Sequence, residues 1–340
     1  MAGGATTPEL VAAVSEAGGL GVFGASGMRV DAIAAAVERA CSLTSAPIGV
    51  NVLLAEPGPP EGNLLALADL ADRYRSELGV AQTVGPSPGS ALELVAAALA
   101  AGARVVSVGL GDPGPVVEIA RAAGVPVVAM VATVADAETA VASGADVIVA
   151  QGAEAGGHRS NFVLPAAGEP LPLVGTMALV PQIVDAVGVP VVAAGGIADG
   201  RGLAAALALG AQGAQIGTRF LMAAESGVIA DYQQRMAAAR DADTVITTAL
   251  SGRPARGLAN RLIRELEALG SPSLGWPRQA GALAAIRRAS EAAGSGELTS
   301  LWCGQAAGLA SEILPAAEIV RQIMDEAAIW ATRAAELLHQ

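Results

Sequence analysis

The chain has 340 residues, a formal net charge of −12 and no lysine, so that all of its fixed side-chain cations are arginines. The acidic balance and an aromatic content of 2% argue against nucleic-acid binding, which needs clustered cations and stacking rings. Without lysine, Schiff-base catalysis and a P-loop lysine are excluded, and the length fits one barrel of about 200 to 250 residues with an appended region.

The first hundred residues predict helices and two short strands. A helix begins after Thr6 or Thr7, where Pro8 suits the first turn and Glu9 is placed for a capping box. It ends before Gly18. A strand at 20–23, a helix at 30–43, a buried strand at 47–54 and a helix at 90–101 follow.

From residue 104 onward, apolar strands alternate with amphipathic helices. The strands are predicted at 105–108, 125–131, 145–150, 189–194 and 214–216, and the helices at 115–123, 136–143, 175–187 and 201–209. This alternation is typical of parallel β/α units whose strands are covered on both faces. The sequence therefore predicts an α/β fold, a TIM-type (β/α)8 barrel.

The strand count and the composition predict how the chain is divided. Seven strands are expected where such a barrel has eight, so we expect the first strand to be truncated and the missing one to precede Met1. The barrel is predicted at 1–222, a helical substrate or lid subdomain at 223–310, and a C-terminal helix packing back on the barrel at 311–340.

The stretch 151–160 follows a predicted strand and carries three glycines before His158. Ligands of α/β folds lie at the carboxyl ends of strands, and glycines let the backbone approach them closely. The other histidine, His339, is next to last, so His158 is the candidate for imidazole chemistry near neutral pH. The alternative is a hydrogen-bonded surface histidine without a catalytic role.

Two further glycine sites follow the last two strands. Gly195 and Gly196 precede Asp199, a predicted helix N-cap, and Gly217 with Thr218 follows the final strand. Backbone amides at these neighbouring ends predict a phosphate site that needs no lysine. The alternative is that the glycines only permit tight turns.

Six segments together resemble the nitronate monooxygenase family, once called 2-nitropropane dioxygenases. They are MAGGATTPELVAAVSEAGGLG, VNVLL, AQGAEAGGHRS, PVVAAGGIADGR, AQIGTRF and SGRPARGLAN, in family order over nearly the whole chain. The resemblance implies a TIM barrel that holds FMN without a covalent link. It also implies oxidation by O2 of alkyl nitronates, such as propionate 3-nitronate, to carbonyl products and nitrite or nitrate.

The resemblance assigns site residues one by one. His158 matches the active-site histidine, which would orient an anionic nitronate or remove the α-proton of a nitroalkane. The FMN contacts implied are Ala2, Gly3, Gly4, Asn51, Gln151, Gly156, Gly157, Gly195, Gly196, Gln215, Ile216, Gly217 and Thr218. The family's Q-A-P-M run is reduced here to Met1, so flavin contacts from that first strand are not expected.

The roles expected of several arginines and one tryptophan are less specific. Arg261 and Arg264 are interpreted as a solvated helix face paired with acidic neighbours, and Arg253 or Arg256 as a less favoured partner for an anionic substrate tail. Trp302, with Gln305, is expected to pack in the helical subdomain, although a lid role fits the family.

Two other functions stay open. One is an FMN-dependent NAD(P)H reductase on the same barrel, acting on enoyl-acyl-carrier-protein or quinone substrates. The other is a flavin-free barrel that binds a phosphate ligand. A nitronate and O2 are the expected partners, a homodimer stays open, and no metal is expected.

Cysteine content and hydropathy predict where in the cell the protein is found. Apolar runs are interrupted before the roughly 18 residues of a membrane span, and no secretory signal is seen. Cys41 and Cys303 lie far apart and predict buried thiols in a reducing cytoplasm, with a single disulfide left open.

Overall fold

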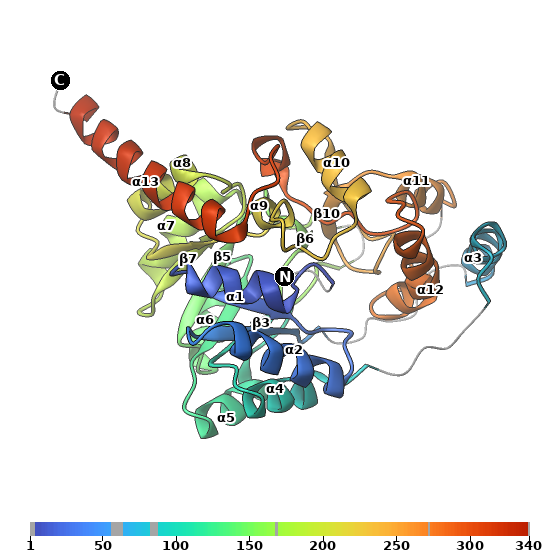
Figure 1. Cartoon of the computed structure of the whole chain (residues 1–340), viewed down its shortest axis with the longest axis horizontal. Coiled ribbons are helices and arrows are strands. Elements are labelled where there is room, and N and C mark those ends of the chain that lie inside the picture. The colour runs from blue at the N-terminus through green and yellow to red at the C-terminus, as the bar shows by residue number, and fades with distance from the viewer. Residues whose placement is uncertain (1–3, 56–63, 82–87, 167–168, 271–272, 339–340) are drawn as a thin grey trace.

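The computed structural model describes residues 4–55, 64–81, 88–166, 169–270 and 273–338. Seven parallel strands form one curled sheet in the order β1-β2-β3-β4-β5-β7-β8 (Figure 1). They are β1 (Gly21–Gly24), β2 (Ile48–Leu53), β3 (Val105–Gly109), β4 (Val127–Val131), β5 (Val147–Gln151), β7 (Val191–Ala194) and β8 (Gly213–Gln215). All seven predicted strands are confirmed. Within the described ranges, β1 and β8 each pair on one side only, so the barrel has two edges.

Helices cover the outer face of this sheet. They are α1 (Pro8–Glu16), α2 (Val30–Leu43), α4 (Ala91–Ala100), α5 (Gly114–Ala122), α6 (Val134–Ala142), α7 (Thr176–Ala186) and α8 (Gly200–Ala208). The short α9 (Thr218–Leu221) follows β8 at its carboxyl end. Thr7 caps α1 and Asp199 caps α8, as predicted. Glu9 does not form a capping box; it pairs with Arg39 instead. Aliphatic side chains of both layers fill a single core, in which Val50, Val106 and Ile148 are fully buried.

The C-terminal helix α13 (Ala316–Leu338) packs back on the barrel, along α8 and α1. Its residues Ile319, Ile323 and Ala327 share a buried cluster with Leu10 of α1 and Leu203 of α8. Because α1 precedes β1 and α8 precedes β8, the helix covers the side on which the two sheet edges lie. Beyond Ala327 it projects away from the body, and all of its residues there are exposed (Figure 1).

Residues 223–310, predicted to form a helical subdomain, also contain strands. They hold α10 (Ala230–Ala238), α11 (Arg261–Glu267), α12 (Arg278–Ala292) and η1 (Gln305–Leu309), and also the antiparallel strands β9 (Thr244–Thr247) and β10 (Ala255–Leu258). The β-branched residues of β9 suit a strand, which the prediction of a helical subdomain did not include. Strand β10 also pairs with β6 (Gly157–His158), which belongs to the barrel loop.

Helix α3 (Leu64–Leu78) also packs in this region although it lies between two barrel strands in sequence. Leu70 and Tyr74 of α3 share a buried cluster with Leu283 and Ile286 of α12. Figure 1 shows α3 beside α12, at the far end from α13. The subdomain is therefore assembled from two separate parts of the chain.

The cysteines match the prediction only in part. Both are free, and Cys303 is buried, which raises the pKa of its thiol to about 12. Cys41 is exposed, because its neighbour Ala40 takes the inward position on α2. No helix of the described residues is long and apolar enough to span a membrane.

Candidate active site

A cavity of about 1750 Å³ runs along the barrel strands and opens against α12. All predicted site residues that the structure describes line it: Gly4, Asn51, Gln151, Gly156, Gly157, His158, Gly195, Gly196, Gln215, Ile216, Gly217 and Thr218. Ala2, Gly3 and His339 lie outside the described residues. Typical ligand pockets enclose about 300–1,000 Å³. This cavity therefore has room for a large cofactor and a substrate together.

Buried arginines hold the loop that follows β5. Arg159 is fully buried and donates from Nη1 to the Gly152 carbonyl at 2.6 Å and from Nη2 to the Gln151 carbonyl at 2.9 Å. Arg256 donates from Nε to the Ala153 carbonyl at 3.0 Å. These bonds give loop carbonyls buried donors, in addition to the turn bond from the Ala155 amide to the Gly152 carbonyl at 3.1 Å. Burial lowers the pKa of Arg159 to about 10, so it stays charged at neutral pH.

The side chain of Gln151 is also part of this scaffold. Its Nε2 donates to the His158 carbonyl at 2.9 Å, and its Oε1 accepts from the Ser160 amide at 2.9 Å. One amide N–H and one lone pair remain for a ligand. Asn51 similarly donates to Ser107 Oγ at 3.0 Å, which leaves its Oδ1 for the cavity.

Close backbone packing requires a glycine in the loop, and hydrogen bonds tie the loop to α7. A Cβ on Gly156 would lie 2.5 Å from the carbonyl carbon of Cys303, a distance that side chains do not adopt. Glu154 ties the same loop to α7, because its carboxylate accepts from the Thr176 amide at 2.9 Å and from Thr176 Oγ1 at 2.9 Å. The loop is fixed on both sides before it reaches His158.

His158 lies in a pocket of two tryptophans and one hydroxyl. Its ring centroid is 5.2 Å from that of Trp276, edge to face, and 5.6 Å from that of Trp302. Its Nε2 is 2.9 Å from Ser251 Oγ. Burial and then the nearby Arg253 lower the pKa of His158 to about 3. The imidazole is therefore neutral at physiological pH, and Nδ1 is the ring nitrogen left for a ligand.

The ends of β7 and β8 present free backbone amides to the cavity. Gly195 and Gly196 have φ angles of 107° and 72°, which favour glycine. In the part of the chain that the structure describes, the amides of Gly196, Gly217 and Thr218 have no protein acceptor. Open space surrounds the Cβ position of Gly217. Unpaired amides around an open space suit an anionic group.

The family model for nitronate monooxygenase matches residues 1–326. The chain belongs to the nitronate monooxygenase family. A probable nitronate monooxygenase of Staphylococcus saprophyticus is 37% identical over 309 residues, covering 89% of this chain and 86% of the relative. One of Staphylococcus aureus is 35% identical over 334 residues, covering 95% and 91%. The chain is thus an enzyme of a flavin-dependent oxidoreductase family.

Solved structures agree with this family. The nitroalkane oxidase of Streptomyces ansochromogenes superposes with a TM-score of 0.83 and 35% identity, covering 98% of this chain and 95% of that one. FabK of Thermotoga maritima gives a TM-score of 0.77 and 34% identity, with 98% and 94% covered. An enoyl reductase domain of MlnA from Bacillus amyloliquefaciens, 14% identical, shares the fold.

The cavity fits the flavin that nitronate monooxygenases use. Among the described residues, three amides without acceptors lie at the ends of β7 and β8, which suits a phosphate group, and the volume exceeds that of a single small ligand. Asn51 and Gln151 line the same cavity, and each keeps polar capacity that its protein hydrogen bonds do not use. The described residues contain no cluster of His, Cys, Asp or Glu that could hold a metal.

The arginine expectations need two corrections. Arg253 and Arg256 do not line the cavity; both are buried and donate to the protein, Arg253 to the Asn161 carbonyl and Arg256 to Thr244 Oγ1 at 3.0 Å. They are structural, and neither meets an anionic tail. Arg261 is paired as expected, with Glu265 at 2.6 Å and also with Glu77 at 2.6 Å. Arg264 is exposed and lies 3.9 Å from Glu297.

Three site residues were missed or undervalued. Trp302 packs in the subdomain as expected but also contacts His158, whereas Gln305 is exposed. Trp276 and Ser251 reach His158 from more than 90 residues away, and no local pattern marks Trp276. The motif that contains Ser251 was the only signal for it.

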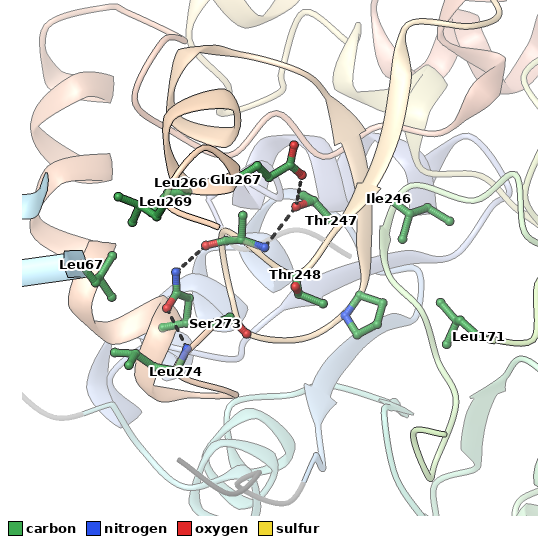
Figure 2. A pocket seen from close by; sticks show the side chains of 13 residues that line it. Leu67, Leu171, Ile246, Thr247, Thr248, Leu266, Glu267, Leu269, Ser273 and Leu274 are labelled. Carbon is green, nitrogen blue, oxygen red and sulfur yellow. Dashed lines mark hydrogen bonds between the residues drawn. The ribbon is translucent and has the colours of Figure 1, made fainter. Parts of the chain in front are cut away.

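A second cavity of about 340 Å³ lies within the subdomain (Figure 2). Its polar wall groups bond to one another: Thr247 donates to Glu267 at 2.8 Å, and Gln279 donates to the Ala249 carbonyl at 2.6 Å. Leucines such as Leu67 and Leu266 form the rest of the wall. It is a packing space between α3, β9 and α11, away from the family's glycine motifs.

Proposed function

We propose that this chain binds FMN and oxidises alkyl nitronates with O2 to carbonyl products and nitrite or nitrate. One observation carries the proposal: the free amides at the ends of β7 and β8 and the His158 imidazole line the same cavity. Family membership supplies the reaction class.

In this proposal the amides of Gly196, Gly217 and Thr218 bind the FMN phosphate, as anion sites built from backbone amides do. Asn51 and Gln151 hold polar atoms of the flavin ring, and Gly156 and Gly157 allow close approach of the backbone. When bound, FMN would supply the redox chemistry between the nitronate and O2. The protein binds and orients the substrate and excludes water from the site.

His158 would bind the substrate through Nδ1. The Ser251 hydroxyl has one proton, which goes either to the Arg253 carbonyl at 3.1 Å or to His158 Nε2 at 2.9 Å. An anion at Nδ1 favours the second arrangement, in which Nδ1 carries the donating hydrogen. A base with a pKa of about 3 removes an α-proton poorly, so the substrate is the preformed nitronate rather than the nitroalkane.

The visible spectrum of the purified protein tests the proposal. We expect the flavin absorption to bleach on anaerobic mixing with a nitronate and to recover with O2. A colourless protein that cannot take up FMN would instead support the flavin-free barrel.

A reductase is the second candidate, favoured by the 34% identity with FabK over nearly the whole chain. Anaerobic NADH and NADPH are its test, because a reductase is bleached by them and not by a nitronate. A cytoplasmic location and a homodimer are further parts of the proposal, which fractionation and sedimentation would test.

A further inference from the structure

Arg253 is a buried cation behind the wall of the large cavity. Only 5% of it is exposed, and it does not line the cavity, whereas Ser251 and His158 do. Its Nη2 donates to the Asn161 carbonyl, and its Nε is buried without a hydrogen-bond partner. Among the described residues, Asp136 is the carboxylate whose charge acts on Arg253, and the two form no ion pair. The charge of Arg253 is therefore not neutralised by contact.

Hydrogen bonds connect the backbone of Arg253 to the imidazole of His158. The Arg253 amide donates to Ser251 Oγ at 3.3 Å, and the Arg253 carbonyl is 3.1 Å from the same oxygen. That oxygen is in turn 2.9 Å from His158 Nε2. The hydroxyl has one proton, which it donates either to the carbonyl or to Nε2. Donation to the carbonyl requires the ring proton on Nε2, and donation to Nε2 requires it on Nδ1.

The charge of Arg253 distinguishes these two tautomers of His158. With the ring proton on Nε2, the positive end of the N–H bond points toward Ser251 and the cation behind it. With the proton on Nδ1, the Nε2 lone pair points there instead, and a positive charge favours the lone pair. The bond from the Arg253 amide also makes the Ser251 hydroxyl a better donor to Nε2. Both effects favour the proton on Nδ1.

We infer that Arg253 is a positioning residue, whose charge acts through the Ser251 hydroxyl and holds His158 in the tautomer that carries its proton on Nδ1. The inference deepens the proposed function and rests on it only for the effect on catalysis. In it, the hydrogen-bond donor is present before the substrate arrives, so an anionic nitronate would meet a donor that needs no rearrangement.

Nitrogen-15 NMR of the flavin-loaded enzyme with labelled histidine tests the tautomer directly, because protonated and unprotonated ring nitrogens have well separated shifts. His339→Gln leaves His158 as the single histidine. We expect the wild-type ring to be protonated on Nδ1 and Arg253→Met to lose this preference. Arg253→Lys, which keeps the charge, should restore it. Arg256→Met is the matched control, since this buried arginine bonds to the Ala153 carbonyl instead, and should leave the tautomer unchanged.

Kinetics with propyl-1-nitronate measure the effect on the substrate. Arg253→Met should lower kcat/KM by about 10-fold, chiefly through KM, because the anion then has to change the tautomer as it binds. Arg253→Lys should recover most of this loss. Asp136→Asn separates charge from scaffolding: it removes the opposing charge and keeps Oδ1, which accepts from the Phe162 amide at 3.4 Å. It should leave the proton on Nδ1 and should not raise KM.

Ser251 variants keep the inference testable if Arg253→Met does not fold. Ser251→Ala should release the tautomer preference, and Ser251→Thr, which keeps a hydroxyl, should retain it. A wild-type ring protonated on Nε2 would overturn the inference. So would a proton that stays on Nδ1 in Arg253→Met or in Ser251→Ala, or one that leaves Nδ1 in Arg256→Met as well. A ring protonated on Nδ1 in an enzyme that oxidises no nitronate would refute the proposed function and leave the inference standing.

Discussion

A titration of the two histidines tests the state of the imidazole in the active site. The chain has only His158 and His339, so a proton NMR spectrum contains two imidazole signals. We expect the His158 signal to keep its neutral position down to about pH 4, because burial and Arg253 lower its pKa to about 3. An unperturbed histidine has a pKa of about 6.5 and is about 97% protonated at pH 5, where His158 would be about 1% protonated.

Variants assign the signals and give the control. His158→Gln removes the signal that does not titrate, and His339→Gln removes the other one. The reasoning is refuted if the signal lost in His158→Gln moves between pH 6 and 7 in wild type. In that case the imidazole could act as a base, and removal of an α-proton from a nitroalkane would become the better interpretation.

The same shift affects stability. The folded-state pKa of His158 lies below the unfolded-state value, so the unfolded state binds more protons between about pH 3 and pH 6.5. The free energy of unfolding therefore rises with pH in this window, by at most about 1.4 kcal/mol per pH unit for one group. Urea denaturation at pH 6 and pH 5 measures this. We expect the fall in stability to be about 1 kcal/mol smaller in His158→Gln than in wild type.

Four further substitutions and one deletion test the scaffold. Gly195→Ala places a Cβ 2.9 Å from a backbone nitrogen, at a φ of 107°. We expect this substitution to lower the FMN content, measured by absorbance. Gly188→Ala, which has open space at its Cβ position, is the control and should not lower it. Arg159→Met leaves two carbonyls without this donor and should lower the free energy of unfolding, measured by urea denaturation, by about 2–4 kcal/mol. Deleting 328–340 should change the melting temperature little, since residues 328–338 are all exposed, whereas Ile323→Ala should cost about 2–5 kcal/mol.

The barrel was predictable because its signals are local. Each strand is a short apolar run between turn residues, and caps such as Thr7 and Asp199 act within three residues of the helix that they begin. The glycines after β7 and β8 could likewise be placed near each other, since neighbouring parallel strands end at the same edge. The arrangement of the site residues around one cavity follows from this order of parallel strands.

The surroundings of His158 were not predictable in the same way. Ser251, Trp276 and Trp302 reach the ring across long sequence separations, and no periodicity marks such contacts. Strand β6 has two residues, too few for a strand pattern. Arg253 and Arg256 were misjudged because burial of an arginine depends on backbone carbonyls that only the fold brings near.

The pairing of β6 with β10 joins the two regions at the imidazole itself. His158 is opposite Ala255 in this pairing, and its ring contacts Trp276, two residues before α12. A substrate bound at the imidazole would therefore contact the barrel loop and the subdomain together.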